Sequence, residues 1–233
     1  MEGIKNWFRM WRREEGAKWA VLSWRQRFQY IWDYYRLWIL GALCALSLLA
    51  YGAAFLRDAG RDNWFCACFA NTYGELGEGS AFRDEFARYA GYDLGEKNLV
   101  FHARIYCDPT RENYVNEYYR LLIALLDSGT LDVLVMERDR LSALGSAGRL
   151  MDLEDSRTRA LYDAYRDRLV WCVPRDEAHG REAVAVGIDL AGSRLVGEGR
   201  AYPADAALGV SALSPHPDQA EVFLRFLFEE AAP

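Results

Sequence analysis

Residues 131–155 read LDVLVMERDRLSALGSAGRLMDLED, and this stretch decides the fold class. The run 131–136 is apolar at every position except Asp132, which is typical of a strand that is covered on both faces of a sheet. Polar residues begin at Glu137, where such a strand would leave the core, and the helical pattern that follows ends at Gly148. A buried strand followed directly by a helix is the repeating unit of α/β proteins.

The alternation of strand and helix continues on both sides of this stretch. Upstream, a helix that begins after Ser80 and another that begins at Asp108-Pro109 have residues suited to a helix start, because serine and aspartate cap helices and proline fits the first turn. The expected strands are 63–70, 99–106, 131–136, 169–173, 183–190 and 207–211, and the later helices are 156–168 and the one that follows 211. We therefore expect a single α/β lobe of three layers, a mainly parallel sheet with helices on both faces.

Residues 37–56, LWILGALCALSLLAYGAAFL, carry no charge and lie between Arg36 and Arg57. Twenty helical residues measure about 30 Å, which matches the hydrocarbon core of a bilayer. The alternatives are a buried core helix and a cleaved signal peptide, but 36 residues before the apolar run are too many for the basic region of a signal peptide. Leu43 before Cys44 does not resemble a lipoprotein cleavage site. We expect an uncleaved transmembrane helix.

Charge is distributed unevenly around this apolar run. Residues 1–36 contain eight Lys or Arg and four Asp or Glu, so this segment carries +4 and the rest of the chain −10 of the formal net charge of −6. The positive-inside rule then places the N-terminus in the cytoplasm and the C-terminal part outside the cell membrane. An acidic remainder argues against nucleic acid as a partner.

Aromatic and apolar residues recur at helical spacing within residues 1–36. We expect this segment to lie in the cytoplasmic membrane interface, with cations near anionic lipid, although packing against a partner protein explains the same pattern. The two stripes are Ile4, Trp7, Phe8 and Trp11, and Phe28, Ile31, Trp32 and Tyr35.

The stretch LLDSGTLDVLVMERDRLSALGSAGRLMDLED (125–155) resembles a segment of the extracellular solute-binding proteins of ABC transporters, which have a class II periplasmic-binding-protein-like fold. In that segment a helix ends at glycine, a strand begins at aspartate, and a further helix leads to G-x-L-x-D-L. The last strand and the following HPDQAEVFLRFLF resemble the same family, with Ala220, Phe223, Leu224 and Leu227 facing inward. The resemblance covers most of residues 63–233 and implies an extracytoplasmic solute-binding-like domain there.

One departure from the family changes what this resemblance implies. Solute-binding proteins grip their ligand between two α/β lobes, whereas only 80 residues follow Leu153 here, too few for a second lobe of ordinary size. We expect a one-lobed, membrane-anchored relative that is an accessory or sensing component of an ABC-type transport system, with a permease or a small solute as partner. The alternative is a non-catalytic module that docks a protein and binds no small molecule.

Ligands of open α/β sheets bind beyond the carboxyl ends of the strands. The residues at those ends are candidate ligand-binding residues, although ordinary turn and cap roles explain them too: Asn71, Thr72, Glu137, Arg138, Ser211 and Ser214. Glu75 and Glu78 in a glycine-rich loop are read as solvated surface. The sequence has no Ser-His-Asp spacing, HExxH, Walker loop or GxGxxG after a strand, so we expect no enzymatic activity, no metal and no cofactor.

The cysteines leave two interpretations open. Cys66 and Cys68 are two residues apart and therefore project to the same face of the first strand. An extracytoplasmic setting would allow one of them to form a disulfide with Cys107, while buried free thiols are the alternative.

Overall fold

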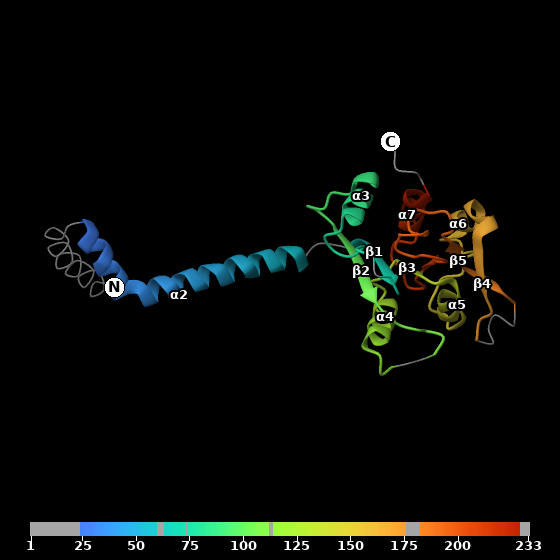
Figure 1. The fold of residues 1–233 in the computed structure, drawn as a ribbon, viewed down its shortest axis with the longest axis horizontal. Helices are drawn as coiled ribbons and strands as arrows, with labels where there is room; N and C mark the ends of the chain where they lie inside the picture. The colour runs from blue at the N-terminus through green and yellow to red at the C-terminus, as the bar shows by residue number, and fades with distance from the viewer. Residues whose placement is uncertain (1–23, 60–62, 73, 112–113, 176–181, 229–233) are drawn as a thin grey trace. The chain divides into compact units, whose positions relative to one another are not determined.

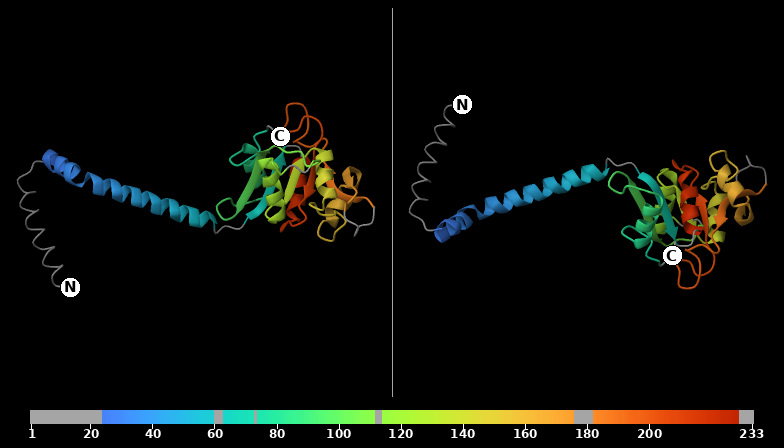
Figure 2. Two further views of the ribbon diagram at one scale, coloured as in Figure 1. Left: turned by 90° about the horizontal axis from the view of Figure 1, so that it is seen from below. Right: turned by 90° about the horizontal axis from the view of Figure 1, so that it is seen from above.

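The computed structural model describes residues 24–59, 63–72, 74–111, 114–175 and 182–228. The chain divides into two compact units, Met1–Gly60 and Arg61–Pro233. The first unit contains helix α2 and the second is an α/β domain, as Figure 1 and the two further views of Figure 2 show.

Helix α2 (Trp24–Ala59) contains the uncharged run predicted to cross a membrane. Its segment Arg36–Leu56 is long and apolar enough to span a bilayer, and none of it is buried against the rest of the chain. A helix that spans a bilayer likewise exposes apolar side chains along its whole length, because they face lipid. The interfacial stripe that begins at Ile4 lies outside the described residues, and so do the side chains of the second stripe apart from Trp32.

Six strands form one sheet in the order β2-β1-β3-β6-β5-β4. The strands are β1 (Asn63–Ala70), β2 (Asn98–Ile105), β3 (Val133–Met136), β4 (Leu169–Cys172), β5 (Val184–Asp189) and β6 (Ala207–Val210). β1 pairs in parallel with β2 and β3, but β3–β6, β6–β5 and β5–β4 are antiparallel. The sheet is therefore mixed, and the expectation of a mainly parallel sheet is wrong.

The antiparallel half of the sheet follows from its connections. Parallel neighbours need a crossover, usually a helix, whereas antiparallel neighbours can be joined by a simple turn. No helix separates β4 from β5 or β5 from β6 among the described residues. β6 also runs opposite to β3, so its carboxyl end lies at the sheet edge where β3 begins.

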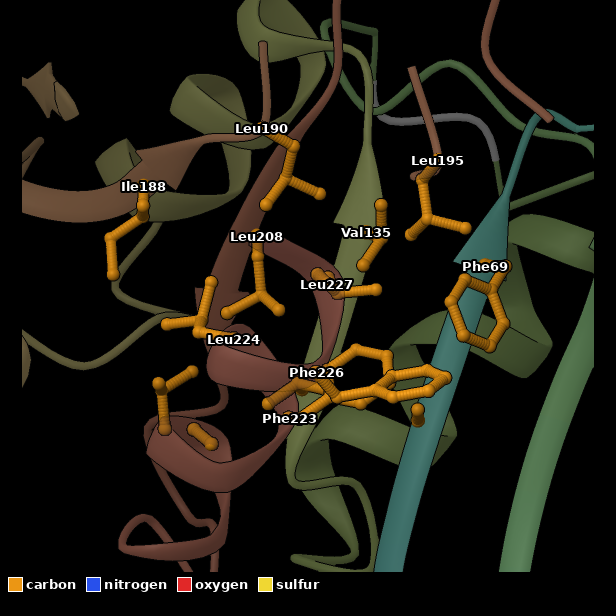
Figure 3. Packing of buried hydrophobic residues seen from close by; sticks show 14 of the residues in the cluster. Phe69, Val135, Ile188, Leu190, Leu195, Leu208, Phe223, Leu224, Phe226 and Leu227 are labelled. Atoms are coloured by element: carbon orange, nitrogen blue, oxygen red, sulfur yellow. The ribbon is translucent and has the colours of Figure 1, made fainter. Parts of the chain in front are cut away.

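Helices cover both faces of the sheet, as predicted. The helices are α3 (Ala81–Tyr89), α4 (Glu117–Asp127), α5 (Arg138–Ser146), α6 (Arg159–Ala164), the 3-10 helix η1 (Arg166–Arg168) and α7 (Gln219–Phe228). Residues of α3, α6 and α7 belong to one buried apolar cluster, and residues of α4 and α5 belong to the other. Figure 3 shows the first cluster, where Phe223 and Leu224 of α7 lie over Phe69 and Leu208 of the sheet.

Strand β1 separates the two clusters through its alternating side chains. Phe65 and Phe69 belong to the cluster beneath α3 and α7, whereas Cys66 and Cys68 belong to the one beneath α4 and α5. All four are buried. This alternation makes β1 a central strand with apolar cover on both sides.

Helix α4 begins later and faces a different way than its sequence predicts. Asn116 caps it by accepting hydrogen bonds from the backbone N–H groups of Tyr118 and Tyr119, whereas Asp108 accepts from the N–H of Thr110 in a turn. The predicted start at Asp108-Pro109 is therefore wrong. Helical spacing predicts a buried stripe of Tyr114, Tyr118, Leu121, Leu122 and Leu125 here. Leu122 is buried as predicted, but Tyr114, Tyr118 and Leu121 are exposed, and the rest of the buried face consists of Tyr119, Ile123 and Leu126.

Candidate functional site at the carboxyl edge of the sheet

The six candidate ligand-binding residues fall at two opposite edges of the sheet. Asn71 and Thr72 follow β1, and Glu137 and Arg138 follow β3, so these four lie at the carboxyl edge of the parallel strands. Ser211 and Ser214 follow the antiparallel strand β6 and lie beside Asp132 at the other edge. The structure therefore brings four of the six residues together.

Asn71 ties the carboxyl ends of three strands to one another. Its backbone is left-handed, with φ of 57°, a conformation that asparagine tolerates better than most residues. Its side-chain amide donates to the carbonyl of Cys107 and to Glu137 Oε2, both at 2.9 Å, and its Oδ1 accepts from the N–H of Cys107 at 2.9 Å. The second oxygen of Glu137 accepts from Arg140 at 2.7 Å.

Thr72 and Arg138 also have partners inside the domain. The buried Thr72 hydroxyl donates to the carbonyl of Ala201 at 2.7 Å and accepts from the N–H of Gly74 at 3.1 Å. Arg138 forms an ion pair with Asp189, which ends β5. The four residues at this edge thus hold loops and strand ends in place.

A cleft of about 390 Å³ opens next to this network, between the glycine-rich loop and the end of β2. It is lined by Gly74, Glu75, Gly77, Glu78, Gly79, Ser80, Ala103 and Arg104. Glu78 also has a structural role. Its carboxylate accepts a hydrogen bond from the N–H of Phe101 at 3.2 Å and lies 3.4 Å from the guanidinium of Arg83. Both acidic and basic side chains therefore line the cleft.

Arg104 is the residue at this edge that sequence reasoning missed. Its φ of 63° is left-handed, which costs an ordinary residue roughly 1–2 kcal/mol. The β1–β2 pairing slips by one residue beside it, between Cys68 and Ala70. The slip turns the backbone at Arg104, and no local residue pattern around positions 102–106 signals it.

Ser211 and Ser214 take part in a different arrangement at the opposite edge. The Ser214 hydroxyl donates to Asp132 Oδ1 at 2.7 Å, and the N–H of Ser211 donates to the carbonyl of Asp132 at 2.9 Å. The Ser211 side chain is fully buried, and its hydroxyl has no partner in the structure. A solute cannot reach either serine without opening the domain.

All five cysteines are free thiols in the structure. Burial raises the pKa of Cys66 to about 12 and the pKa of Cys107 to about 11, and it raises the pKa of Cys68 well above its ordinary value. Since the thiolate is the nucleophile, protonated buried thiols react slowly at neutral pH. The disulfide that would join Cys107 to Cys66 or Cys68 stays a prediction.

Burial lowers the pKa of His102, and the nearby carboxylate of Glu78 opposes this shift. In the part of the chain that the structure describes, no group of three or more His, Cys, Asp or Glu side chains is arranged to hold a metal ion.

Comparisons with protein-family models, with curated proteins and with solved structures give no match for this chain. The resemblance to solute-binding proteins therefore rests on the sequence patterns at 125–155 and after residue 207.

Proposed function

We propose that this chain is a membrane-anchored interaction module whose α/β domain docks a protein partner outside the membrane. The observation that carries this proposal is an apolar surface on and just before α4. Tyr114, Val115, Tyr118 and Leu121 are 55%, 90%, 46% and 47% exposed. Tyr118 and Leu121 are three residues apart on α4 and therefore lie on one face of it, while Tyr114 and Val115 precede the helix.

The exposed surface is more than α4 needs for its own packing. The opposite side of the helix already buries Tyr119, Leu122, Ile123 and Leu126 in the core. A surface helix ordinarily has one apolar stripe and a polar outer face. A group of exposed apolar side chains beyond that stripe is typical of a site where another protein binds.

The candidate ligand-binding residues support docking over solute capture. Asn71, Thr72, Glu137 and Arg138 already use their side chains to hold strand ends and loops together. A solute at this edge would have to replace those hydrogen bonds and would gain little by doing so.

The partner that fits best is a membrane protein on the same side of the bilayer, such as the permease of a transport system. An anchor confines both proteins to one surface and raises their effective concentration, so a modest interface suffices. This choice of partner rests on the resemblance to the solute-binding proteins of ABC transporters.

Photo-crosslinking in intact cells tests the docking surface. With a benzophenone side chain in place of Tyr118, we expect a covalent adduct with a second membrane protein, because this side chain is exposed at the start of α4 between Val115 and Leu121 in the chain. The same probe in place of Tyr89, which is 41% exposed on α3, is the matched control and should give none. Adding Leu121→Glu should reduce the adduct at least tenfold, since a buried charge without a partner costs more than the ~1.4 kcal/mol that a factor of ten requires.

Equal adducts from positions 118 and 89, or an adduct that Leu121→Glu leaves unchanged, would contradict docking through α4. The second candidate function, an accessory solute-binding component, is favoured by the cleft beside Arg104. It would replace the docking proposal if no adduct formed while a sugar, peptide or polyamine raised the melting temperature of the full chain and Arg104→Ala abolished that rise.

A further inference from the structure

The connection between β5 and β6, residues 190–206, forms a compact loop, which we call the β5–β6 loop. Its two ends are held together, because the N–H of Leu190 donates to the carbonyl of Ala206 at 2.9 Å. Within the loop, the N–H of Tyr202 donates to the carbonyl of Leu195 at 3.0 Å. Both of these side chains are 2% exposed, so the loop is anchored in the core.

The hydroxyl of Tyr202 lies between the ends of two strands. It forms hydrogen bonds to the carbonyl of Ala70, the last residue of β1, at 2.7 Å and to the carbonyl of Val135 in β3 at 3.0 Å. Burial raises the pKa of Tyr202 well above its ordinary value, so the hydroxyl keeps its proton and acts as the donor. One proton is thus shared between two carbonyl oxygens.

These two strand ends define the topological switch point of the sheet. β1 and β3 are parallel neighbours. After β1 the chain turns to α3, which packs in one apolar cluster, whereas after β3 it turns to α5, which packs in the cluster on the other face. Open α/β sheets bind their ligands beyond the carboxyl ends of such a pair of strands. In this domain the side chain of Tyr202 occupies that position.

A second contact closes the same edge of the sheet. The hydroxyl of Thr72, two residues after β1, donates to the carbonyl of Ala201 at 2.7 Å. Gly74 lies so close to the loop that a Cβ there would come within 3.0 Å of the Cβ of Ala201. Ala70 and Val135 are both 0% exposed. A solute therefore reaches their carbonyl groups only if it displaces the β5–β6 loop.

We propose that the switch point of this domain is a ligand site that the chain occupies itself, with Tyr202 in the place of the ligand. The chemistry that the site accepts is an aromatic ring with one hydrogen-bond donor. The ring packs in the apolar cluster shared with α3 and α7, and the donor meets the two carbonyl oxygens. The β5–β6 loop thereby closes the domain to solutes at this position. The inference does not rest on docking through α4, because no residue of α4 takes part in these contacts of Tyr202.

Removal of the tyrosine side chain tests whether the position is a binding site. Tyr202→Ala leaves a buried space, and p-cresol, the tyrosine side chain as a free molecule, is the probe. In thermal melts of the full chain in detergent micelles, we expect p-cresol to raise the melting temperature of this variant. Toluene, which lacks the hydroxyl, should bind at least about fivefold more weakly, which corresponds to about 1 kcal/mol for the lost hydrogen bond. Neither compound should raise the melting temperature of the parent chain.

Two further variants serve as controls. Tyr202→Phe keeps the ring and loses only the hydroxyl, so it should stay closed to both compounds. Leu195→Ala also leaves a buried space, since Leu195 is as buried as Tyr202 and belongs to the same loop and the same apolar cluster. Its side chain makes no hydrogen bond, so p-cresol should have no comparable advantage over toluene there.

Three results would overturn the proposal. The first is a folded Tyr202→Ala variant in which p-cresol binds no better than toluene, the second is an equal advantage of p-cresol in Leu195→Ala, and the third is an equal response of the parent chain. If Tyr202→Ala does not fold by itself, p-cresol should restore the domain during refolding where toluene does not. A variant that p-cresol fails to restore also contradicts the proposal.

Discussion

Replacing Asp132 by alanine is expected to lower the free energy of unfolding of the α/β domain by about 3 kcal/mol or more. The carboxylate is 1% exposed and accepts hydrogen bonds from the N–H of Cys66 at 2.8 Å, the hydroxyl of Ser214 at 2.7 Å and the N–H of His216 at 3.1 Å. Alanine would leave the buried N–H of Cys66 and the hydroxyl of Ser214 without this acceptor, whereas the N–H of His216 would keep its 3.2 Å hydrogen bond to the Ser214 hydroxyl. The change in unfolding free energy is measured by urea titration of the full chain in detergent, with limited proteolysis as the probe of how much of the domain is unfolded.

Ser214→Ala is the matched control, because it keeps the carboxylate and removes only the hydroxyl, which donates to Asp132 and accepts from the N–H of His216 at 3.2 Å. It should cost about 1 kcal/mol. The role assigned to Asp132 would be untenable if Asp132→Ala were no more destabilising than Ser214→Ala.

Gly187→Ala is expected to destabilise the domain by about 2–3 kcal/mol, although it adds a single methyl group. A Cβ at this position of β5 would lie 2.6 Å from a methyl carbon of Leu141 and 2.9 Å from the carbonyl oxygen of Leu208. The leucine end can move, but the carbonyl belongs to the neighbouring strand β6 and cannot retreat without breaking the sheet. The urea midpoint of the same unfolding transition reports the loss.

Gly77→Ala provides the comparison, because a Cβ there would meet Ala103 at 3.5 Å, an ordinary contact. We expect its midpoint to stay within experimental error of the parent chain. Similar losses from the two substitutions would show that the α5–β5 contact is looser than the structure describes.

The positions of the strands were predictable where a short apolar run identifies them. β1, β3 and β5 are short runs of apolar residues between polar ones, and each lies within two residues of its expected bounds. Strand direction was not predictable in the same way. Direction depends on how the chain returns between strands. The helix-free connections before β5 and β6 permit antiparallel pairing but do not require it, so the sequence pattern alone did not fix the direction.

The wrong direction predicted for β6 explains why the candidate ligand-binding residues lie at two opposite edges of the sheet. Ser211 and Ser214 were grouped with Asn71 because parallel strands place all their carboxyl ends at one edge. β6 runs the other way, so the serines lie with Asp132 instead. Arg104 escaped notice because its left-handed backbone arises from a slip in pairing between two strands, which only the folded sheet reveals.

For Asp132, the sequence pattern identifies the residue but not its hydrogen-bond partners. One charged residue in an otherwise apolar run was visible from the start. Its partners Cys66, Ser214 and His216 lie 66 or more positions away, so spacing could not identify them. The exposure of Tyr118 and Leu121 was missed for a related reason: helical spacing predicts a stripe that contains them, but spacing does not say which of two apolar faces of a helix turns inward.

The orientation of the chain in a membrane is the claim on which docking outside the cell depends. Single cysteines introduced at Glu198, which is exposed in the α/β domain, and at Lys18 test it with a membrane-impermeant maleimide. The native cysteines of the domain are buried, and the raised pKa of Cys66 and Cys107 keeps their background labelling low. We predict that Glu198→Cys is labelled in intact cells and that Lys18→Cys is labelled only after permeabilisation. Labelling of Lys18→Cys in intact cells, with Glu198→Cys protected, would contradict the account.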